Sequence, residues 1–428
     1  MEGKDSRPAW SMILRARLVL PMSRPPIADG ALRVAGNRIL EVGRWRDLGQ
    51  TRKQKVCDLG EAVLMPGLVN AHCHLDYTNM AGQFHPPKVF IDWLKLITTT
   101  KAGWNYSDYL TSWSDGAQML ARTGTTLVAD VEAVPELLPE VWNRTPLRVI
   151  TFLEMIGITG RRSPQAILEE ILRQLDSLAP SRHQVGLSPH APYSTLPELL
   201  RLTAAAAGEH GWRVTTHVAE SALEFEMFAT GKGAMFDWLR RSGREMSDCG
   251  LGSPLQYLER HGLLRENLLA IHVNYLARGD AARLTRCGVY VVHCPRSHHY
   301  FGHAPFPLRR LHRAGVNICL GTDSLASVLK SRRQAVELSL FEEMRRLRTT
   351  DPWLTPKAIL RMATLNGARA LGLKGQVGEL AEGALADLIV LPFAGRPREV
   401  YDAVLAHSGH VSASMIDGRW VIRPGLNR

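Results

Sequence analysis

The sequence predicts an α/β protein: a (β/α)8 barrel, the TIM-barrel fold class, with a small flanking β-sandwich. Between residues 63 and 324, eight short apolar runs typical of buried strands alternate with amphipathic stretches typical of helices. Eight such repeats in one block favour a closed parallel barrel. The two ends of the chain carry short alternating strands and turn signals instead. With 428 residues, 45% of them apolar, the chain is long enough for one large and one smaller domain.

The barrel strands are expected, in chain order, at residues 63–74, 125–131, 147–156, 185–190, 214–220, 268–274, 289–294 and 316–322. Helical stretches lie between them, for example residues 163–178, in which Ile167, Ile171 and Leu175 recur every four positions. Further helices are expected within residues 325–377, where Thr355 suits an N-cap and Pro356 the first helical position. In such a barrel the carboxyl ends of all strands meet at one mouth, so residues hundreds of positions apart come together there.

The two flanking segments are expected to fold together. Their turn signals are Asp29-Gly30, Gly36-Asn37, Glu382-Gly383 and Asp417-Gly418. Neither segment buries enough apolar surface by itself. We therefore expect residues 1–65 and 379–428 to form one composite β-sandwich domain, and residues 66–378 to form the barrel.

Ionisable residues end several of the predicted strands. His72 and His74 close the first run, and strand alternation points both imidazoles to the same side, where they can share one metal ion. Four later runs end in further groups of this kind, namely His217 with Glu220, His272, His293 and Asp323. For any single histidine a satisfied core position is the better interpretation. Burying the whole set is costly unless the groups are paired or coordinated, so together they favour a site.

The charge pattern argues against a nucleic-acid partner. The net charge is +11, but Lys and Arg are mixed with Glu along helical segments and no basic tail is present. We expect only a general attraction for anions. There is no run of about 18 apolar residues, and residues 1–8 lack the apolar core of a signal peptide. No membrane span is therefore expected, and a cytoplasmic location is. Six scattered cysteines without a Cys-x-x-Cys pair are expected to be reduced thiols.

These motifs resemble the amidohydrolase superfamily over nearly the whole chain. The matching pieces are PGLVNAHCH at 66–74, HVAE at 217–220, His272, HCPRS at 293–297, GTDS at 321–324 and the segment 377–390. Within the superfamily the chain is similar to the branch of cytosine-, guanine-, adenosylhomocysteine- and aminodeoxyfutalosine-type deaminases and triazine chlorohydrolases, whose members use one metal ion. In agreement with this, the third and fourth strands end in TFLEM at 151–155 and SPHA at 188–191. Neither has a lysine that could be carboxylated to bridge two metals.

The resemblance implies one divalent metal ion per chain, with Zn²⁺ expected first and Fe²⁺ or Mn²⁺ as alternatives. The implied ligands are His72, His74, His217 and Asp323, a nitrogen and oxygen set that suits these metals. A water bound to such an ion has its pKa lowered towards about 7. Glu220 would carry a proton from this water to a ring nitrogen of the substrate. His272 would hydrogen-bond the attacking oxygen or the tetrahedral intermediate, and Asp323 would orient the attacking oxygen.

The loops at the mouth bear on the substrate. The layout LDYTNM at 75–80 followed by FIDWLKL at 90–96 is similar to that of aminodeoxyfutalosine deaminases, which place an acidic residue beside the metal histidines and a Trp-Leu segment soon after. The candidates for substrate binding are Asp76, Trp93, Arg161, His190 and Arg296. A purely structural role is at least as good an interpretation of each, for example helix core for Trp93. The chain departs from many relatives at His298, His299 and His303, which we interpret as a lid or substrate loop.

The favoured hypothesis is a metal-dependent hydrolytic deaminase that removes an exocyclic amine from a purine nucleoside or related heterocycle, with the aminodeoxyfutalosine type preferred. One alternative is a non-deaminating hydrolase of the same superfamily, a chlorohydrolase or a cyclic amidase. Another is a catalytically inactive barrel that binds a ligand, although every expected catalytic position is filled. The expected partner is a small heterocyclic substrate, and a homodimer is the default assembly for a soluble enzyme.

Overall fold

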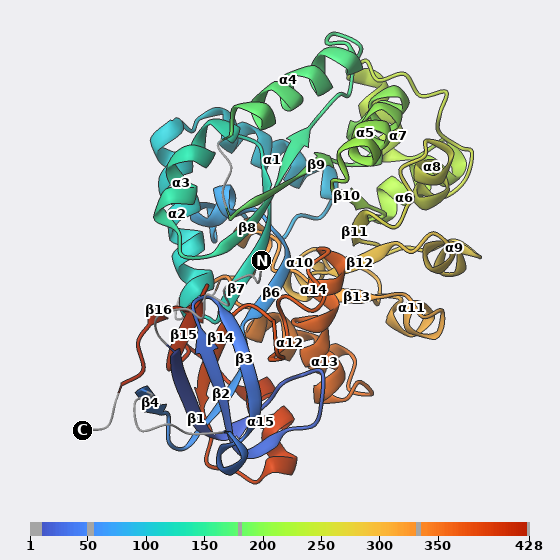
Figure 1. The fold of residues 1–428 in the computed structure, drawn as a ribbon. Helices are drawn as coiled ribbons and strands as arrows, with labels where there is room; N and C mark the ends of the chain where they lie inside the picture. Colours follow the sequence, from blue (N-terminus) through green and yellow to red (C-terminus); the bar gives the residue numbers. More distant parts are fainter. Residues whose placement is uncertain (1–10, 49–54, 179–181, 331–334, 426–428) are drawn as a thin grey trace, which may run out of the picture.

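The structure, a computed structural model, describes residues 11–48, 55–178, 182–330 and 335–425. Two eight-stranded sheets organise these residues, one forming the barrel and one built from both ends of the chain. In Figure 1 the blue strands of the N-terminal segment lie beside the red strands of the C-terminal segment, below the barrel. Residues 1–8, on which we based the expectation about a signal peptide, lie outside the described residues. Among the described helices, none is long and apolar enough to span a membrane.

The barrel sheet consists of parallel strands that neighbour one another in chain order. They are β6 (Leu68–Cys73), β7 (Thr125–Glu132), β8 (Arg148–Met155), β9 (Gln184–Pro189), β10 (Val214–Val218), β11 (Leu268–His272), β12 (Tyr290–His293) and β13 (Ile318–Leu320). A bridge between Cys73 and Asp323 brings the last strand back to the first. There the Thr322 amide donates to the His72 carbonyl at 3.0 Å. The predicted barrel is confirmed, and each predicted run overlaps one of its strands.

The first predicted strand is in fact two strands. Residues Ala62–Pro66 form β5, which pairs in the terminal sheet, and only β6 belongs to the barrel. Gly67 separates them. A Cβ at this position would lie 2.1 Å from the side chain of Thr126, so only glycine permits the close approach to β7. The apolar run is unbroken across this point, which is why its periodicity does not reveal the change of sheet.

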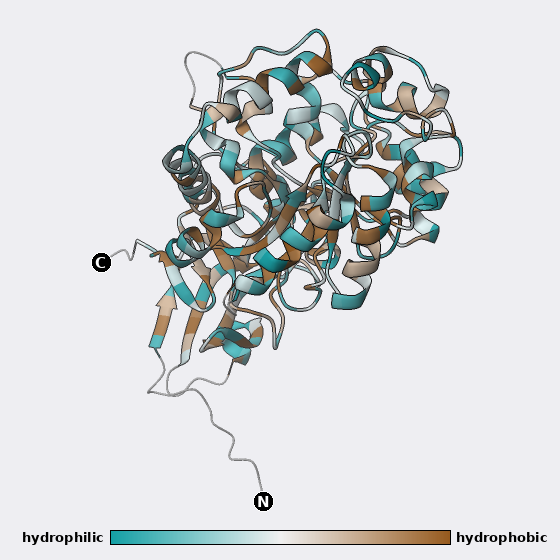
Figure 2. Cartoon of the chain, turned by 90° about the horizontal axis from the view of Figure 1, so that it is seen from above, coloured by the Kyte–Doolittle hydropathy of each residue, from teal (hydrophilic) through white to brown (hydrophobic). Residues whose placement is uncertain are grey.

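Helices follow the barrel strands along the chain. They are α1 (Phe90–Ala102), α2 (Tyr106–Arg122), α3 (Leu138–Arg144), α4 (Pro164–Ser177), α5 (Pro197–His210), α6 (Ala222–Thr230), α7 (Ala234–Arg241), α8 (Pro254–Arg260), α9 (Asp280–Arg286), α10 (Pro295–Tyr300), α11 (Leu308–Arg313), α12 (Leu340–Thr350), α13 (Pro356–Met362), α14 (Leu365–Ala370) and α15 (Val400–Ala406). The last four of them, α12 to α15, come after the final barrel strand. As predicted, Thr355 caps α13 by accepting from the amide of Ala358, and Pro356 follows it. In Figure 2 apolar residues concentrate on the central strands and polar residues on the surrounding helices.

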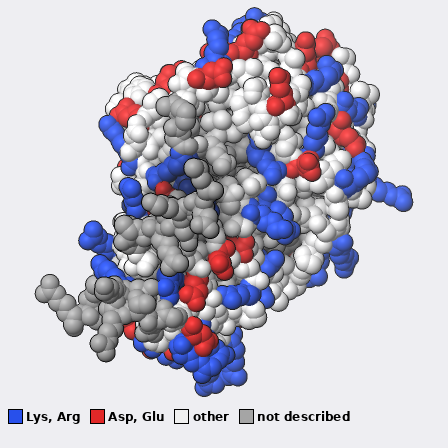
Figure 3. All heavy atoms as spheres, viewed as in Figure 1, with Lys and Arg blue, Asp and Glu red and all other residues white. Residues whose placement is uncertain are grey.

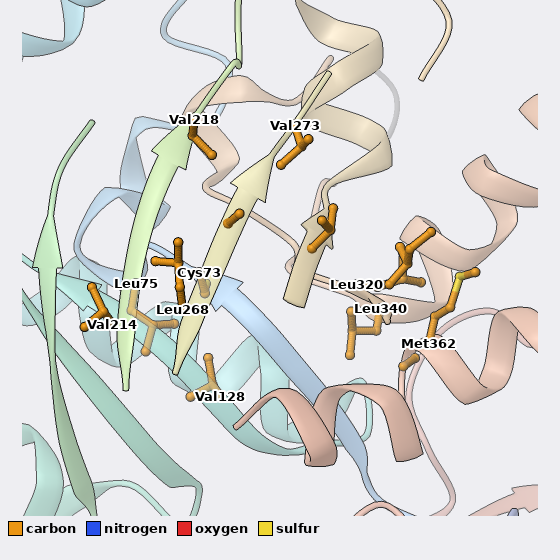
Figure 4. Close-up of a cluster of buried hydrophobic side chains, with 14 of the residues drawn as sticks. Cys73, Leu75, Val128, Val214, Val218, Leu268, Val273, Leu320, Leu340 and Met362 are labelled. Atoms are coloured by element: carbon orange, nitrogen blue, oxygen red, sulfur yellow. The ribbon is translucent and has the colours of Figure 1, made fainter. Parts of the chain in front are cut away.

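Two apolar clusters lie on the two sides of the barrel strands, because alternate residues of a strand face opposite ways. The larger cluster joins strands to the outer helices. Figure 4 shows part of it, with Val214 and Val218 on β10 beside Leu268 on β11. The second cluster combines side chains of six barrel strands, including Ile150 and Phe152 of β8, and fills the barrel interior. The next residue on that face of β8 is Glu154, at the mouth.

The terminal sheet is one hydrogen-bonded sheet that forks at β1. Its strands are β1 (Ser11–Val19), β2 (Ile27–Ala35), β3 (Arg38–Arg44), β4 (Lys55–Asp58), β5, β14 (Leu388–Pro392), β15 (Ala413–Ile416) and β16 (Arg419–Ile422). Strand β1 pairs antiparallel with β2 and parallel with both β4 and β5. Both arms contribute to one core, with Leu32 from β2 and Leu388 from β14. The predicted β-sandwich thus takes the form of a forked sheet around a shared core.

One predicted turn in this region is wrong. Asp29-Gly30 lies inside β2, where Gly30 pairs with Ala16 of β1. A Cβ on Gly30 would approach the Val19 side chain to 2.7 Å, so the glycine allows close packing rather than a turn. Gly36-Asn37 does form the turn between β2 and β3, as predicted. On the face of the molecule visible in Figure 3, Lys and Arg lie interspersed with Asp and Glu.

Candidate metal centre and catalytic cavity

Four strand ends bring the predicted metal ligands together at the mouth of the barrel. His72 and His74 follow from β6, His217 from β10, and Asp323 lies just beyond β13, and all four side chains are buried. The Nε2 atoms of His74 and His217 are 3.2 Å apart. The Oδ1 atom of Asp323 lies 3.7 Å from His72 Nε2 and 3.9 Å from His74 Nε2. His272, at the end of β11, belongs to the same group of possible ligand atoms.

This arrangement fits a divalent metal ion. Two nitrogens bound tetrahedrally to zinc at about 2.1 Å lie about 3.4 Å apart, close to the separation of His74 and His217 Nε2. The Nδ1 atom of His217 donates to the carbonyl of His190 at 2.9 Å, which leaves its Nε2 lone pair free. Neither ring nitrogen of His72 has a hydrogen-bond partner among the described residues, although the side chain is only 1% exposed. A bound ion would satisfy one of these two buried nitrogens, since an imidazole offers one ligand atom to a single ion.

Burial also sets the protonation of the imidazoles. It lowers the pKa of His217 to about 3, with further lowering by the neighbouring His190 and His72. Burial likewise lowers the pKa of His74 and of His272 well below the ordinary value. These histidines are therefore neutral near pH 7, and neutral imidazole is the form that binds metals.

Glu220 and His272 stand beside the ligand group. The Oε1 atom of Glu220 lies 3.5 Å from Nε2 of His272. Burial raises the pKa of Glu220 well above its usual value, and the carboxylates of Asp323 and Glu224 raise it further. Glu224 fixes the backbone here, because its side-chain oxygens accept from the amides of Ala219 at 3.0 Å and Glu220 at 2.9 Å. Our prediction did not include Glu224, whose sequence signal is only that of a residue in the first turn of a helix.

The backbone at these strand ends is strained. Seven non-glycine residues have a positive φ in the described part of the chain, and four of them lie at the mouth: Ala219, His272, Val273 and Asp323. Such conformations cost of order 1–3 kcal/mol each and gather at functional sites. The strain is independent evidence that the strand ends serve more than packing.

A cavity opens over the ligand group. Of the predicted substrate residues, Trp93 and His190 line it. The prediction missed Tyr77, Lys101, Glu154 and Tyr193, which line it as well. For Glu154 a signal was available, since it shares the inward face of β8 with Ile150 and Phe152. Lys101 lies in the last turn of helix α1 among polar residues, where no periodic pattern marks it.

Three predicted substrate residues do not line this cavity. Arg161 lies on the surface in the loop before α4. Arg296 is held by Glu343, whose Oε1 accepts from its Nε at 2.6 Å, so it forms a buried ion pair instead. Asp76 is fully buried, and neither of its carboxylate oxygens has a hydrogen-bond partner within the described ranges. Burial raises the pKa of Asp76 well above its ordinary value.

The histidines at the end of β12 and just after it line a separate hollow. His293, His298, His299 and His303 surround it, and none of them lines the catalytic cavity. The ring of His293 stacks on Phe306 with centroids 3.8 Å apart, and Nε2 of His298 lies 2.9 Å from the carbonyl of Ala304. Of the five strand ends predicted to carry site residues, four therefore converge and that of His293 does not.

A (β/α)8 barrel with a buried histidine and carboxylate group at its mouth defines a class of metal-assisted hydrolases. The chain matches the amidohydrolase family over residues 63–421 and belongs to that family. It is accordingly a hydrolytic enzyme that acts on carbon–nitrogen bonds.

Known relatives and structures agree with this assignment. The chain is 31% identical over 419 residues to a 5-methylthioadenosine/S-adenosylhomocysteine deaminase of Syntrophobacter fumaroxidans, covering 92% of this chain and 88% of that one. It is 28% identical to an aminodeoxyfutalosine deaminase of Deinococcus radiodurans, covering 81% and 82%. A zinc-bound adenosine deaminase from Xanthomonas campestris has the same fold, with a TM-score of 0.81, 24% identity and coverage of 96% and 93%.

Proposed function

We propose that the protein is a metal-dependent hydrolytic deaminase that replaces the exocyclic amine of a purine nucleoside, or of a closely related heterocycle, and releases ammonia. The observation that carries the proposal is the meeting of three histidines and a carboxylate with Glu220 and His272 at one buried cavity. The deaminase relatives support the choice of leaving group, and the aminodeoxyfutalosine and adenosylhomocysteine types are favoured.

Four side chains would hold the ion: His72, His74, His217 and Asp323. A divalent ion bound there, zinc in preference to iron or manganese, supplies Lewis acidity and lowers the pKa of water from about 15.7 towards about 7. The His190 carbonyl keeps the His217 ring in the tautomer that presents Nε2. We expect one ion per chain, because no lysine stands at the ends of β8 and β9 to bridge a second.

The remaining side chains would move protons and orient the reacting groups. Glu220 accepts a proton from the attacking water and delivers it to a ring nitrogen, and its raised pKa suits a group that must hold that proton near neutral pH. His272 donates to the oxygen that adds to the amine-bearing carbon, and Asp323 orients the water. A carbon–oxygen bond forms and the carbon–nitrogen bond breaks. The amine leaves as ammonia after taking up the second proton of the attacking water, so that a carbonyl remains and the first proton stays on the ring nitrogen.

Three further parts of the proposal, on domains, assembly and location, rest on the sequence. Residues 1–65 and 379–428 would form one domain and residues 66–378 the other. A homodimer and a cytoplasmic location complete the proposal, as defaults for an enzyme of this kind.

The test is ammonia release by zinc-loaded protein from aminodeoxyfutalosine, adenosylhomocysteine, methylthioadenosine, adenosine, guanine and cytosine. We expect release from a purine nucleoside, and none from His217→Ala protein. His210→Ala is the matched control, since His210 ends α5 with its ring stacked on Trp212 and should leave activity intact. Chloride or carboxylate release without ammonia, from triazines or cyclic amides, would favour the non-deaminating hydrolase. If the protein binds metal but forms no product from any of these compounds, an inactive barrel that binds a ligand would be favoured.

A further inference from the structure

Lys101 places an ammonium group in the wall of the catalytic cavity. It is the one lysine or arginine among the described side chains that line it. Its Nζ atom contacts the Tyr77 hydroxyl and lies 4.7 Å from the centroid of the Tyr77 ring. That ring stacks on His74, with centroids 5.1 Å apart. One aromatic side chain therefore separates the ammonium from a predicted metal ligand.

No described carboxylate forms an ion pair with this ammonium, although the buried Asp76 and Glu132 act on it at longer range. Within the part of the chain that the structure describes, no carboxylate oxygen lies within 4.0 Å of Lys101 Nζ. On the same helix, Lys95 is largely exposed and pairs with Asp92 at 3.5 Å. Holding a half-buried cation without an ion-pair partner is unfavourable. The walls of a cavity also concentrate the field of such a cation on incoming ligands. The ammonium of Lys101 is therefore available to bind an anionic group of a ligand.

The rest of the wall suggests the kind of molecule that carries this anion. Trp93 and Ile97 of α1, with Ile156 after β8, give the cavity apolar surface beside Lys101. Glu154 lines it from β8 and is not within ion-pair distance of Lys101, so its oxygens can accept hydroxyl donors such as those of a sugar. A nucleoside with an apolar substituent ending in a carboxylate matches all three kinds of surface.

We propose that Lys101 determines specificity by binding a carboxylate on the sugar substituent of the substrate, so that anionic nucleosides are preferred over neutral ones. This inference rests on the deaminase function proposed above. With the amine-bearing carbon beside Glu220 and His272, the substituent extends towards α1. The flexible lysine stem lets the ammonium follow carboxylates at the ends of substituents of different length.

The test compares aminodeoxyfutalosine and adenosylhomocysteine, which carry a carboxylate, with methylthioadenosine, which does not. In Lys101→Met protein we expect the ratio of kcat/KM for the carboxylate substrates to that for methylthioadenosine to fall about 10- to 100-fold, mostly through KM. Lys101→Arg should restore part of the ratio because it keeps the charge. Lys95→Met, which removes a charge from the same helix outside the cavity, should leave the ratio as it is.

Binding measured by calorimetry distinguishes a failure of this inference from a failure of the proposed deaminase function. Dissociation constants show whether Lys101 binds the carboxylate even if the protein releases no ammonia. Tighter binding of the carboxylate nucleosides to the parent protein, lost in Lys101→Met, supports the inference. Equal binding of charged and neutral nucleosides to the parent, or a preference that survives Lys101→Met, overturns it. A loss of metal or of thermal stability in Lys101→Met would not change the preference, which is why the ratio is the deciding quantity.

Discussion

Buried histidines at the two ends of the barrel differ in how their nitrogens are satisfied. At the base, just before β9, His183 accepts from the Val149 amide at 3.2 Å through Nδ1 and lies 3.3 Å from the Trp142 carbonyl through Nε2. At the mouth, neither nitrogen of His72 has such a partner in the described structure. An unsatisfied buried polar group costs about 1–3 kcal/mol. The base therefore uses its polar residues for the fold, and the mouth keeps them for a ligand.

Charged groups show the same contrast. At the base, Arg148 of β8 donates to Asp387 at 2.6 Å and to Asp417 at 2.5 Å, which ties the barrel to the terminal sheet. At the mouth, the carboxylates of Glu220 and Asp323 have no lysine or arginine within ion-pair distance among the residues described here. Buried charges that serve stability are paired, whereas those kept for chemistry are left for a metal or a substrate.

Glu220→Gln should have the largest effect of these substitutions, and it should lower activity without lowering stability. We expect kcat to fall about 10²- to 10⁴-fold, because glutamine keeps the shape but cannot carry a proton. The free energy of unfolding should change by less than about 1 kcal/mol, since the substitution replaces a buried carboxyl group by an amide of the same shape and opens no cavity. Steady-state ammonia release and urea unfolding measure the two quantities. Glu226→Gln, exposed on α6, is the control. A Glu220→Gln enzyme as active as the parent would contradict the role we assign.

Arg148→Met should do the reverse and act on the base. Removing the arginine leaves the Asp387 carboxylate buried without its cation, which we expect to lower the free energy of unfolding by about 3–5 kcal/mol. The kcat of the folded protein should stay at the parent value. Urea unfolding followed by tryptophan fluorescence, with ammonia release on the folded protein, checks both. Arg15→Met removes a more exposed arginine paired with Asp29 and Asp58, and should cost about 0–1 kcal/mol. Equal losses in the two variants would refute the distinction.

The sequence predicted the mouth well because strand ends leave a regular signal. His72, His217 and Asp323 each end an apolar run, and the barrel topology places all strand ends on one side. The same reasoning could not separate the roles of similar residues beyond the strands. Arg296 follows β12 as a substrate-binding arginine would, but it meets Glu343, which lies 47 residues further along the chain.

Lys101 illustrates the opposite failure. It lies on α1, which is connected to β6 by a loop, and only the path of that loop over the mouth turns the lysine into the cavity. Such a path depends on tertiary packing, here of Tyr77 against His74, which leaves no periodic pattern in the sequence. The division of the first strand at Gly67 was hidden for a related reason, because close packing against Thr126 requires the glycine and the hydrophobic pattern does not change there.

The smallest effect is expected from pH and from His183. Burial, with the nearby Arg182, lowers the pKa of His183 to about 4, below the value of about 6.5 in an unfolded chain. The neutral ring therefore stabilises the fold above pH 6.5, and this contribution is lost as the pH falls from there towards 4.

His183→Gln keeps an acceptor for Val149 and a donor for Trp142 but does not titrate. Between pH 7 and pH 5 the stability advantage of the parent over the variant should shrink by about 1 kcal/mol, after allowance for solvent screening. Urea unfolding of both proteins at pH 7, 6 and 5 measures the difference, in which groups common to both cancel. An advantage that grows on acidification would mean that His183 is charged in the fold, and the base would then resemble the mouth in holding a titratable group for use.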